Sequence, residues 1–274
     1  KVIIVDNVYP EIDEFNIEPT REVIQDVFEE HIIHAPGMEK IKELVTGSIM
    51  PTPGAVMNAA KILQDDIGDL IVFDVGGATT DLHSVTEGSE EIKDILISPE
   101  PLAKRTVEGD LGVYVNAENV VERVGKKLLE EKLGFPIEKV LKNRNPIFKN
   151  KQEKKLIEEI TAEAVKTAVE RHAGSLKEIY GPSGRTTIAS GKDLTRIKWI
   201  IGTGGALTNL ENSREILEKI RVKDPIKKLY PLASAEILID EDYNMASLGV
   251  LGKEQPEAAV RLLKQSLRFD KAKI

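Results

Sequence analysis

Short runs of apolar residues alternate with longer amphipathic segments along this chain. Four runs have the length and the β-branched content of buried strands, and they occupy residues 2–5, 70–73, 197–201 and 237–239. Residues 81–85 alternate polar and apolar side chains, which is typical of a returning strand. A further strand is expected within residues 92–98.

Apolar residues at three- and four-residue spacing predict helices between these strands. Such helices are expected at 20–30, 117–133, 152–172, 210–220 and 257–267, with a short one near 38–44. Two further helical segments, 54–63 and 245–251, are rich in small residues and could pack close to a neighbouring backbone. The alternation of strands and helices predicts an α/β fold.

The composition is that of an ordinary globular protein and narrows the chemistry mainly by exclusion. Hydrophobic residues make up 41% of the 274, which is enough for a buried core. The absence of cysteine excludes disulfides, thiol catalysis and cysteine-ligated metals. A net charge of −8 disfavours general binding to nucleic acid. No apolar run reaches the roughly 20 residues that span a bilayer, so we expect a cytoplasmic protein without membrane contact.

The strongest candidate for chemistry is the turn after the second apolar run, where residues 73–81 read Phe-Asp-Val-Gly-Gly-Ala-Thr-Thr-Asp. Successive backbone N–H groups in such a turn can form a nest for phosphate, and Thr79 and Thr80 would add hydroxyl donors. Asp74 and Asp81 would bring two carboxylates to the same mouth, which makes sense with Mg²⁺ between them. The simpler alternative is a β-hairpin whose turn merely uses two glycines.

A second glycine turn, residues 202–205 (Gly-Thr-Gly-Gly), follows the strand at 197–201 and precedes a helix. Such a turn can approach a nucleotide, but it can equally be a tight connection. It lacks the Gly-Lys-Ser/Thr of a Walker A loop and the full pattern of a dinucleotide-binding fingerprint. His83 lies two residues beyond Asp81, and a packed strand residue is a simpler interpretation of it than a catalytic base.

Four motifs in this order resemble the actin/Hsp70/hexokinase ATPase superfamily. The turn at 74–81 resembles its second phosphate motif, and Gly-Gly-Ala at 204–206 resembles its adenosine motif. Residues 51–60 and 245–249 resemble its two connecting helices. Within the superfamily, three stretches resemble the glutamate mutase accessory family, also called GlmL or MutL: 76–84, 105–112 and 202–209.

The resemblance implies a chaperone-like ATPase that reactivates an adenosylcobalamin-dependent mutase. ATP or ADP and Mg²⁺ would be its cofactors, and a mutase subunit would be its partner. Asp74 is implied as the residue that orients the attacking water and holds the metal, with Asp81 as a second metal ligand. Contacts to phosphate or adenosine are implied for Gly76, Gly77, Thr79, Thr80, Gly202, Gly204 and Gly205. Two alternatives remain: a small-molecule kinase or hydrolase of the same fold, and a scaffold with a vestigial nucleotide cleft.

The resemblance also implies a division of the chain. Residues 66–115 and 195–274 would form a ribonuclease-H-like ATPase lobe, and 116–194 a mostly helical subdomain. Residues 1–65 would be a remnant of a first lobe plus the first connecting helix, whose initial strand could pair with a second copy in a homodimer. The superfamily's first phosphate motif has no match before Asp74, so we expect an N-terminal part to precede this chain. ATP hydrolysis is therefore expected of the full-length protein rather than of this chain alone.

Overall fold

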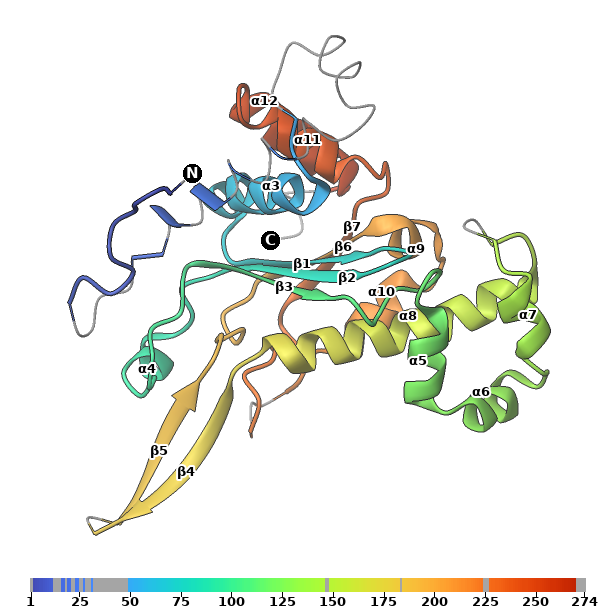
Figure 1. The fold of residues 1–274 in the computed structure, drawn as a ribbon, viewed down its shortest axis with the longest axis horizontal. Coiled ribbons are helices and arrows are strands. Elements are labelled where there is room, and N and C mark those ends of the chain that lie inside the picture. Colours follow the sequence, from blue (N-terminus) through green and yellow to red (C-terminus); the bar gives the residue numbers. More distant parts are fainter. Residues whose placement is uncertain are drawn as a thin grey trace.

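The computed structural model describes residues 2–11, 49–145, 148–182, 184–223 and 227–269, together with 16, 17, 19, 20, 23, 24, 27 and 31. A five-stranded mixed sheet with helices on both faces forms its centre (Figure 1). This architecture confirms the α/β class that the sequence predicts. The helices expected at 20–30 and 38–44 fall mostly or wholly outside the described residues.

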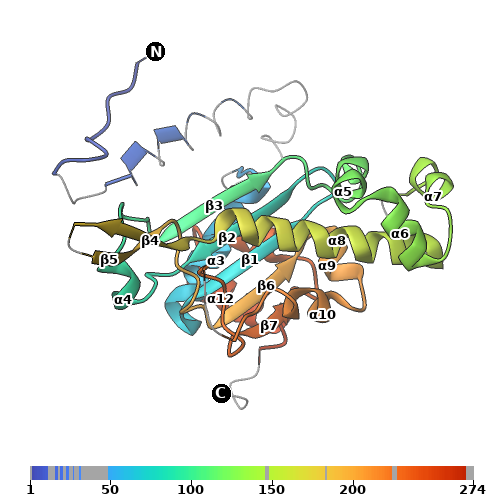
Figure 2. The same ribbon diagram turned by 90° about the horizontal axis from the view of Figure 1, so that it is seen from below.

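The sheet joins an antiparallel half to a parallel half at strand β1 (Leu70–Val75). Strands β2 (Thr80–Val85) and β3 (Ala103–Glu108) continue from β1 as an antiparallel meander. Strands β6 (Trp199–Thr203) and β7 (Glu236–Ile239) run parallel to β1 on its other side. The order across the sheet is β3-β2-β1-β6-β7 (Figure 2). The carboxyl ends of β1 and β6 therefore lie side by side, at the kind of edge where open α/β sheets bind ligands.

One face of the sheet is covered by helices α3 (Thr52–Ile67), α11 (Met245–Leu251) and α12 (Pro256–Ser266). Helices α3 and α11 cross in close contact, as their small residues predict. A Cβ atom on Gly249 would lie 1.9 Å from the carbonyl oxygen of Ala55, so only glycine fits at this position. The Asn58 side-chain amide donates a hydrogen bond of 2.7 Å to the Gly249 carbonyl across the same contact.

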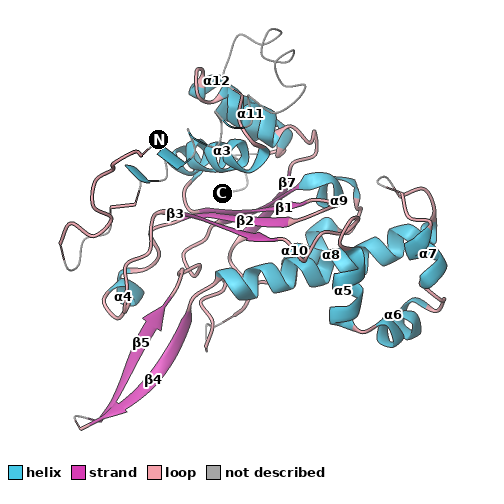
Figure 3. Cartoon of the chain, viewed as in Figure 1, coloured by secondary structure: helices cyan, strands magenta, loops and turns pink. Residues whose placement is uncertain are grey.

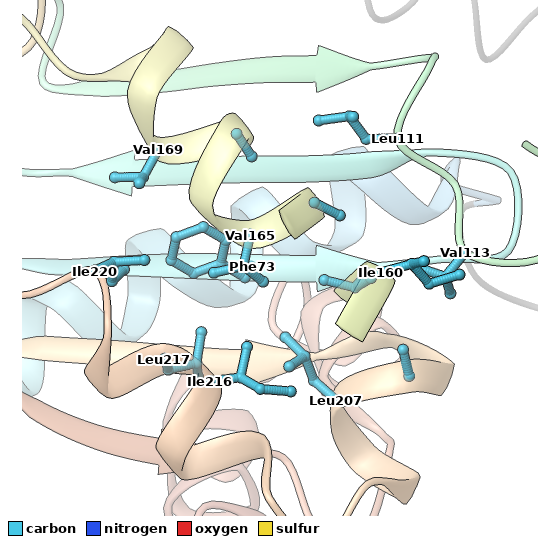
Figure 4. Packing of buried hydrophobic residues seen from close by; sticks show 14 of the residues in the cluster. Phe73, Leu111, Val113, Ile160, Val165, Val169, Leu207, Ile216, Leu217 and Ile220 are labelled. Carbon is cyan, nitrogen blue, oxygen red and sulfur yellow. The ribbon is translucent and has the colours of Figure 1, made fainter. Parts of the chain in front are cut away.

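The opposite face is covered by helix α8 (Lys151–His172), which lies across β1, β2 and β3 (Figure 2). Phe73 of β1 is fully buried beneath α8, among apolar side chains of the helices beside it (Figure 4). The core on this face of the sheet also contains residues of α5 (Ala117–Val124), α6 (Lys126–Leu133), α7 (Glu138–Lys142), α9 (Gly204–Asn209) and α10 (Ser213–Glu218). No helix within the described ranges combines the length and the apolar character needed to cross a membrane.

Strands β4 (Ser175–Gly181) and β5 (Gly184–Ser190) form a two-stranded arm that projects away from the sheet (Figure 3). The arm is bonded to the body near its base, where Ala189 pairs with Leu96 and Ser175 pairs with Lys228. Beyond that base most of its residues are exposed. The segment 116–194 thus contains this arm as well as helices, and its helix α8 packs on the sheet. The division of the chain into domains stays a prediction.

The prediction of a strand at 92–98 is wrong, because helix α4 (Glu90–Lys93) covers the beginning of that segment and the third strand is β3 instead. The Ser89 side chain caps this helix by accepting a hydrogen bond from the Ile92 amide. The apolar run at 2–5 is also not a strand, and Val2 and Ile4 are almost fully exposed.

Two helices expected from the sequence differ in their bounds from those in the structure. The helix expected at 117–133 ends at Gly125, whose φ of 97° lies in the left-handed region and terminates α5 before α6 begins. The helix expected at 210–220 is present as the shorter α10, and α9, which ends at Asn209, precedes it as a separate helix that was not predicted. In the first of these two cases, glycine at a positive φ is the point where the sequence periodicity and the backbone differ.

Two buried histidines differ in how their ring nitrogens are paired. His83 on β2 is fully buried, and neither ring nitrogen has a partner in the described part of the chain. His172 on α8 bonds through both nitrogens, to Thr106 Oγ1 at 2.9 Å and to Ser84 Oγ at 2.8 Å. Burial lowers the pKa of each imidazole to about 3, so both are neutral near pH 7. His83 is therefore a packed strand residue, as its position in the sequence suggested.

Replacing His83 with Leu should raise the free energy of unfolding by about 1–3 kcal/mol, because it removes unpaired buried polar atoms. Replacing His172 with Leu should lower it by a similar amount, because the hydroxyls of Thr106 and Ser84 lose their partner. Urea unfolding at pH 7.5 measures both changes.

The gain in the free energy of unfolding from His83→Leu should grow as the pH falls from 7.5 to 5. Unfolded wild-type His83 takes up a proton below about pH 6.5, whereas folded His83 resists protonation down to about pH 3. Acid therefore destabilises the wild type through His83 as well as through His172, and the leucine variant lacks the His83 contribution. Equal losses of stability in the two leucine variants would contradict the difference in pairing.

Candidate functional site

The structure brings the two glycine turns singled out in the sequence to one edge of the sheet. In the strand register, Asp74 of β1 lies opposite Asp81 of β2 on one side and opposite Thr203 of β6 on the other. The turn 76–79 and the turn 202–205 therefore leave the sheet from neighbouring positions. Asp74 lies between them, at the end of a strand that is otherwise buried.

The turn between β1 and β2 is held from behind through its carbonyl groups. The carbonyls of Gly76, Gly77 and Ala78 accept hydrogen bonds of 2.6–3.2 Å from the loop 113–116. Inside the turn, the Gly76 amide donates to the Thr79 carbonyl at 2.9 Å. The amides of residues 77–79 donate to no group in the described part of the chain, and Gly77 and Ala78 are exposed. The turn thus presents three successive unpaired N–H groups, as a phosphate nest requires.

The glycines of this turn are required for space and not for an unusual backbone conformation, since neither Gly76 nor Gly77 has a positive φ. A Cβ on Gly77 would approach the Cβ of Tyr114 to 3.2 Å, so the loop behind the turn limits the space there. The same loop contributes Gly112, where a Cβ would lie 2.3 Å from the Ala78 carbonyl. The turn and its supporting loop are therefore fitted to each other through small residues.

The second turn is packed against the end of β1 through Gly204. A Cβ there would lie 2.6 Å from both Asp74 Oδ1 and the Val75 amide nitrogen, and the φ of 87° also favours glycine. Gly205 follows on the partly exposed side. Gly202 differs, because a Cβ on it would meet Leu217 and Ile239 in the core at 2.9 and 3.0 Å. The space that Gly202 provides is thus filled by apolar packing.

Two of the three carboxylates near this edge are already engaged. Asp81 accepts hydrogen bonds from Thr79 Oγ1 at 3.0 Å and from Arg105 Nε at 2.8 Å. Asp240, which follows β7 and is fully buried, accepts from Thr203 Oγ1, the Met245 amide and Ser266 Oγ at 2.8, 3.0 and 2.5 Å. The side-chain carboxylate of Asp74 accepts no hydrogen bond from the described residues. It is the carboxylate available to a ligand.

The environment of Asp74 raises its pKa to about 6. Burial is the main cause, and the negative charges of Asp81 and Asp240 add to it, while the Arg105 guanidinium opposes it. A carboxyl group that titrates this close to neutrality is typical of a functional site.

The threonine hydroxyls of the first turn already have acceptors. Thr79 donates to Asp81, and the fully buried Thr80 donates to the Leu111 carbonyl at 2.8 Å. The phosphate contacts assigned to these two residues stay predictions. Among the described residues, no group of three or more His, Asp or Glu side chains could hold a metal ion. A cation at Asp74 would need oxygen ligands from another molecule, as Mg²⁺ commonly obtains from phosphates.

Three residues at this edge escaped the sequence analysis as site residues: Arg105, Asp240 and Tyr243. Asp240 directly follows an apolar run, just as Asp74 does, and that signal could have identified it. Arg105 lies on β3, a strand that was not predicted. Tyr243 lies in the turn between β7 and α11, and its position depends on contacts that only the fold supplies.

Comparison with known proteins gives two matches. A family model described as MutL protein matches residues 1–267. A protein named MutL from Clostridium tetanomorphum is 37% identical over 283 aligned residues, which cover 96% of this chain and 60% of that relative. The chain thus spans about 60% of the length of the curated relative that it matches. Both matches confirm the family resemblance seen in the sequence, and the chain belongs to the MutL family.

Proposed function

We propose that this chain forms the nucleotide-binding half of an ATPase that reactivates an adenosylcobalamin-dependent mutase of the glutamate mutase type. The observation that carries the nucleotide part is the turn after β1, where three unpaired amides at 77–79 lie next to the unengaged carboxylate of Asp74. Such amides bind phosphate oxygens. The mutase part rests on the family resemblance in the sequence and on membership of the MutL family.

The described residues fit a magnesium nucleotide, with different residues for the phosphate oxygens and for the cation. The amides of 77–79 would hold phosphate oxygens, and Asp74 would hold the cation through water or orient the attacking water. Arg105 neutralises Asp81 and so limits the negative charge that an incoming phosphate meets. Bound ATP and Mg²⁺ would supply the transferable phosphoryl group. Because this chain offers one side of the cleft that the resemblance implies, we expect turnover from the full-length protein.

The proposal is tested with the full-length protein and a candidate glutamate mutase. Association is measured by pull-down with and without ATP and Mg²⁺, and cobalamin exchange is followed by its absorbance. We expect both association and exchange to depend on ATP. If neither depends on ATP, the reactivating role is wrong, even if the protein binds nucleotide.

Replacing Asp74 with Asn in the full-length protein should lower ATP hydrolysis by about 100-fold or more, because the group that orients water or its metal is lost. ATP binding should weaken less than hydrolysis, since the amides of 77–79 remain. Steady-state hydrolysis and calorimetric titration measure the two effects. Asp94→Asn, which changes an exposed carboxylate after α4, is the matched control. Wild-type turnover in Asp74→Asn would remove Asp74 from the mechanism.

The binding of magnesium ATP should weaken as the pH falls from 7.5 to 5. The raised pKa of Asp74, about 6, means that its carboxyl becomes protonated in this window and loses its ability to hold the cation. Calorimetric titration at fixed Mg²⁺ should show this weakening in the wild type and a smaller one in Asp74→Asn. An equal pH dependence in both proteins would assign the titration to another group.

A further inference from the structure

The turn that joins β7 to α11 contains a strained tyrosine. Tyr243 has a φ of 49°, and it is one of two non-glycine residues with a positive φ among those described; the other is Arg268. The left-handed region is unfavourable for a bulky aromatic residue. Such a conformation persists only where the surroundings enforce it, and it is often associated with function.

The turn 240–244 is held in place from two sides. On the inside, the Asp240 carboxylate bonds to β6, α11 and α12, and the Tyr243 amide donates to the Asp240 carbonyl at 3.1 Å. On the outside, Arg268 pairs with Glu241 at 3.0 Å and with Asp242 at 2.9 Å. These bonds hold the turn in the conformation that gives Tyr243 its positive φ.

Packing of the Tyr243 ring does not explain why a tyrosine is placed here, because 61% of the residue is exposed. Its hydroxyl lies 3.9 Å from the position that a Cβ on Gly205 would occupy. Partial burial and the charges of Asp74 and Asp240 raise the pKa of the phenol, while a hydrogen bond with the Gly205 backbone opposes that rise. The ring is therefore beside the second glycine turn, within electrostatic reach of Asp74.

Three features follow one another along this edge of the sheet. The unpaired amides of 77–79 come first, then Gly204 and Gly205, which carry no side chain, and then the exposed ring of Tyr243. A ligand with phosphates at one end and an aromatic base at the other matches this order. Aromatic side chains bind bases by stacking, with little dependence on hydrogen-bond pattern.

We propose that Tyr243 is the stacking surface for the base of a purine nucleotide whose phosphates lie at the turn 76–79. This inference rests on the proposed nucleotide site and adds the residue that distinguishes a nucleoside triphosphate from inorganic triphosphate.

The test compares the binding of magnesium ATP and of magnesium triphosphate to the full-length protein by calorimetry. Tyr243→Ala should weaken ATP binding at least about fivefold, the lower end of measured stacking contributions, and leave triphosphate binding within about twofold. Tyr243→Phe keeps the ring and should retain ATP binding. Tyr180→Ala, which removes an exposed tyrosine from the arm, is the control for loss of a surface ring.

Two further variants separate stacking from effects on the fold. Tyr243→Asn should be at least as stable as the wild type to heat, because Asn tolerates a positive φ, and yet it should bind ATP as weakly as Tyr243→Ala. In Tyr243→Trp, tryptophan fluorescence should change on addition of ATP and remain unchanged with triphosphate.

The outcomes distinguish this inference from the function on which it rests. Wild-type ATP affinity in both Tyr243→Ala and Tyr243→Asn would overturn the stacking role while leaving the nucleotide site intact. Equal weakening of ATP and triphosphate would also overturn it, because the residue would then only support the fold of the site. A wild-type protein that binds neither compound would remove the nucleotide site and the stacking role together.

Discussion

Strand β1 is buried on both faces and hydrogen-bonded on both edges, and the rest of the structure is arranged around this constraint. Ile71 and Phe73 enter the core under α8, whereas Leu70 and Val72 enter the core under α3. A strand of this kind can carry a charged group only where it leaves the sheet. Asp74 occupies that position, and its raised pKa reflects how incompletely it has left the interior. The two glycine turns beside Asp74, at 76–79 and 202–205, use glycine at positions where a side chain would collide with neighbouring atoms.

Helices α3 and α11 lie against each other on the face of the sheet opposite α8. Their contact at Gly249 is too close for any side chain. Asp240 links the sheet to helix α11, because its buried carboxylate bonds to a hydroxyl of β6 and to the first amide of α11. Such a carboxylate is stable without a cation because its oxygens are fully hydrogen-bonded. The position of Tyr243 follows from this junction, three residues further on.

The parts of the site that could be predicted from the sequence are those in which neighbours along the chain are neighbours in space. The turn 74–81 is continuous, and its carboxylates and glycines are visible in the sequence. The long periodic helix α8 was predicted to within a residue. Strand β3 was not predicted, because this edge strand alternates charged residues such as Arg105 with few apolar ones. The contact of Arg105 with Asp81 depends on strand pairing, and that of Asp240 with Thr203 depends on a parallel crossover. Neither relation leaves a local signal.

The arm formed by β4 and β5 has a different relation to the rest of the fold. A two-stranded ribbon is marginally stable by itself in water, and among the described residues this one is bonded to the body only near its base. The outer residues of the arm that the structure describes belong to neither of the two cores. Substitutions there change the free energy of the arm without changing that of the sheet. Residues of the outer arm can therefore be exchanged without a change in the geometry of the edge that carries Asp74.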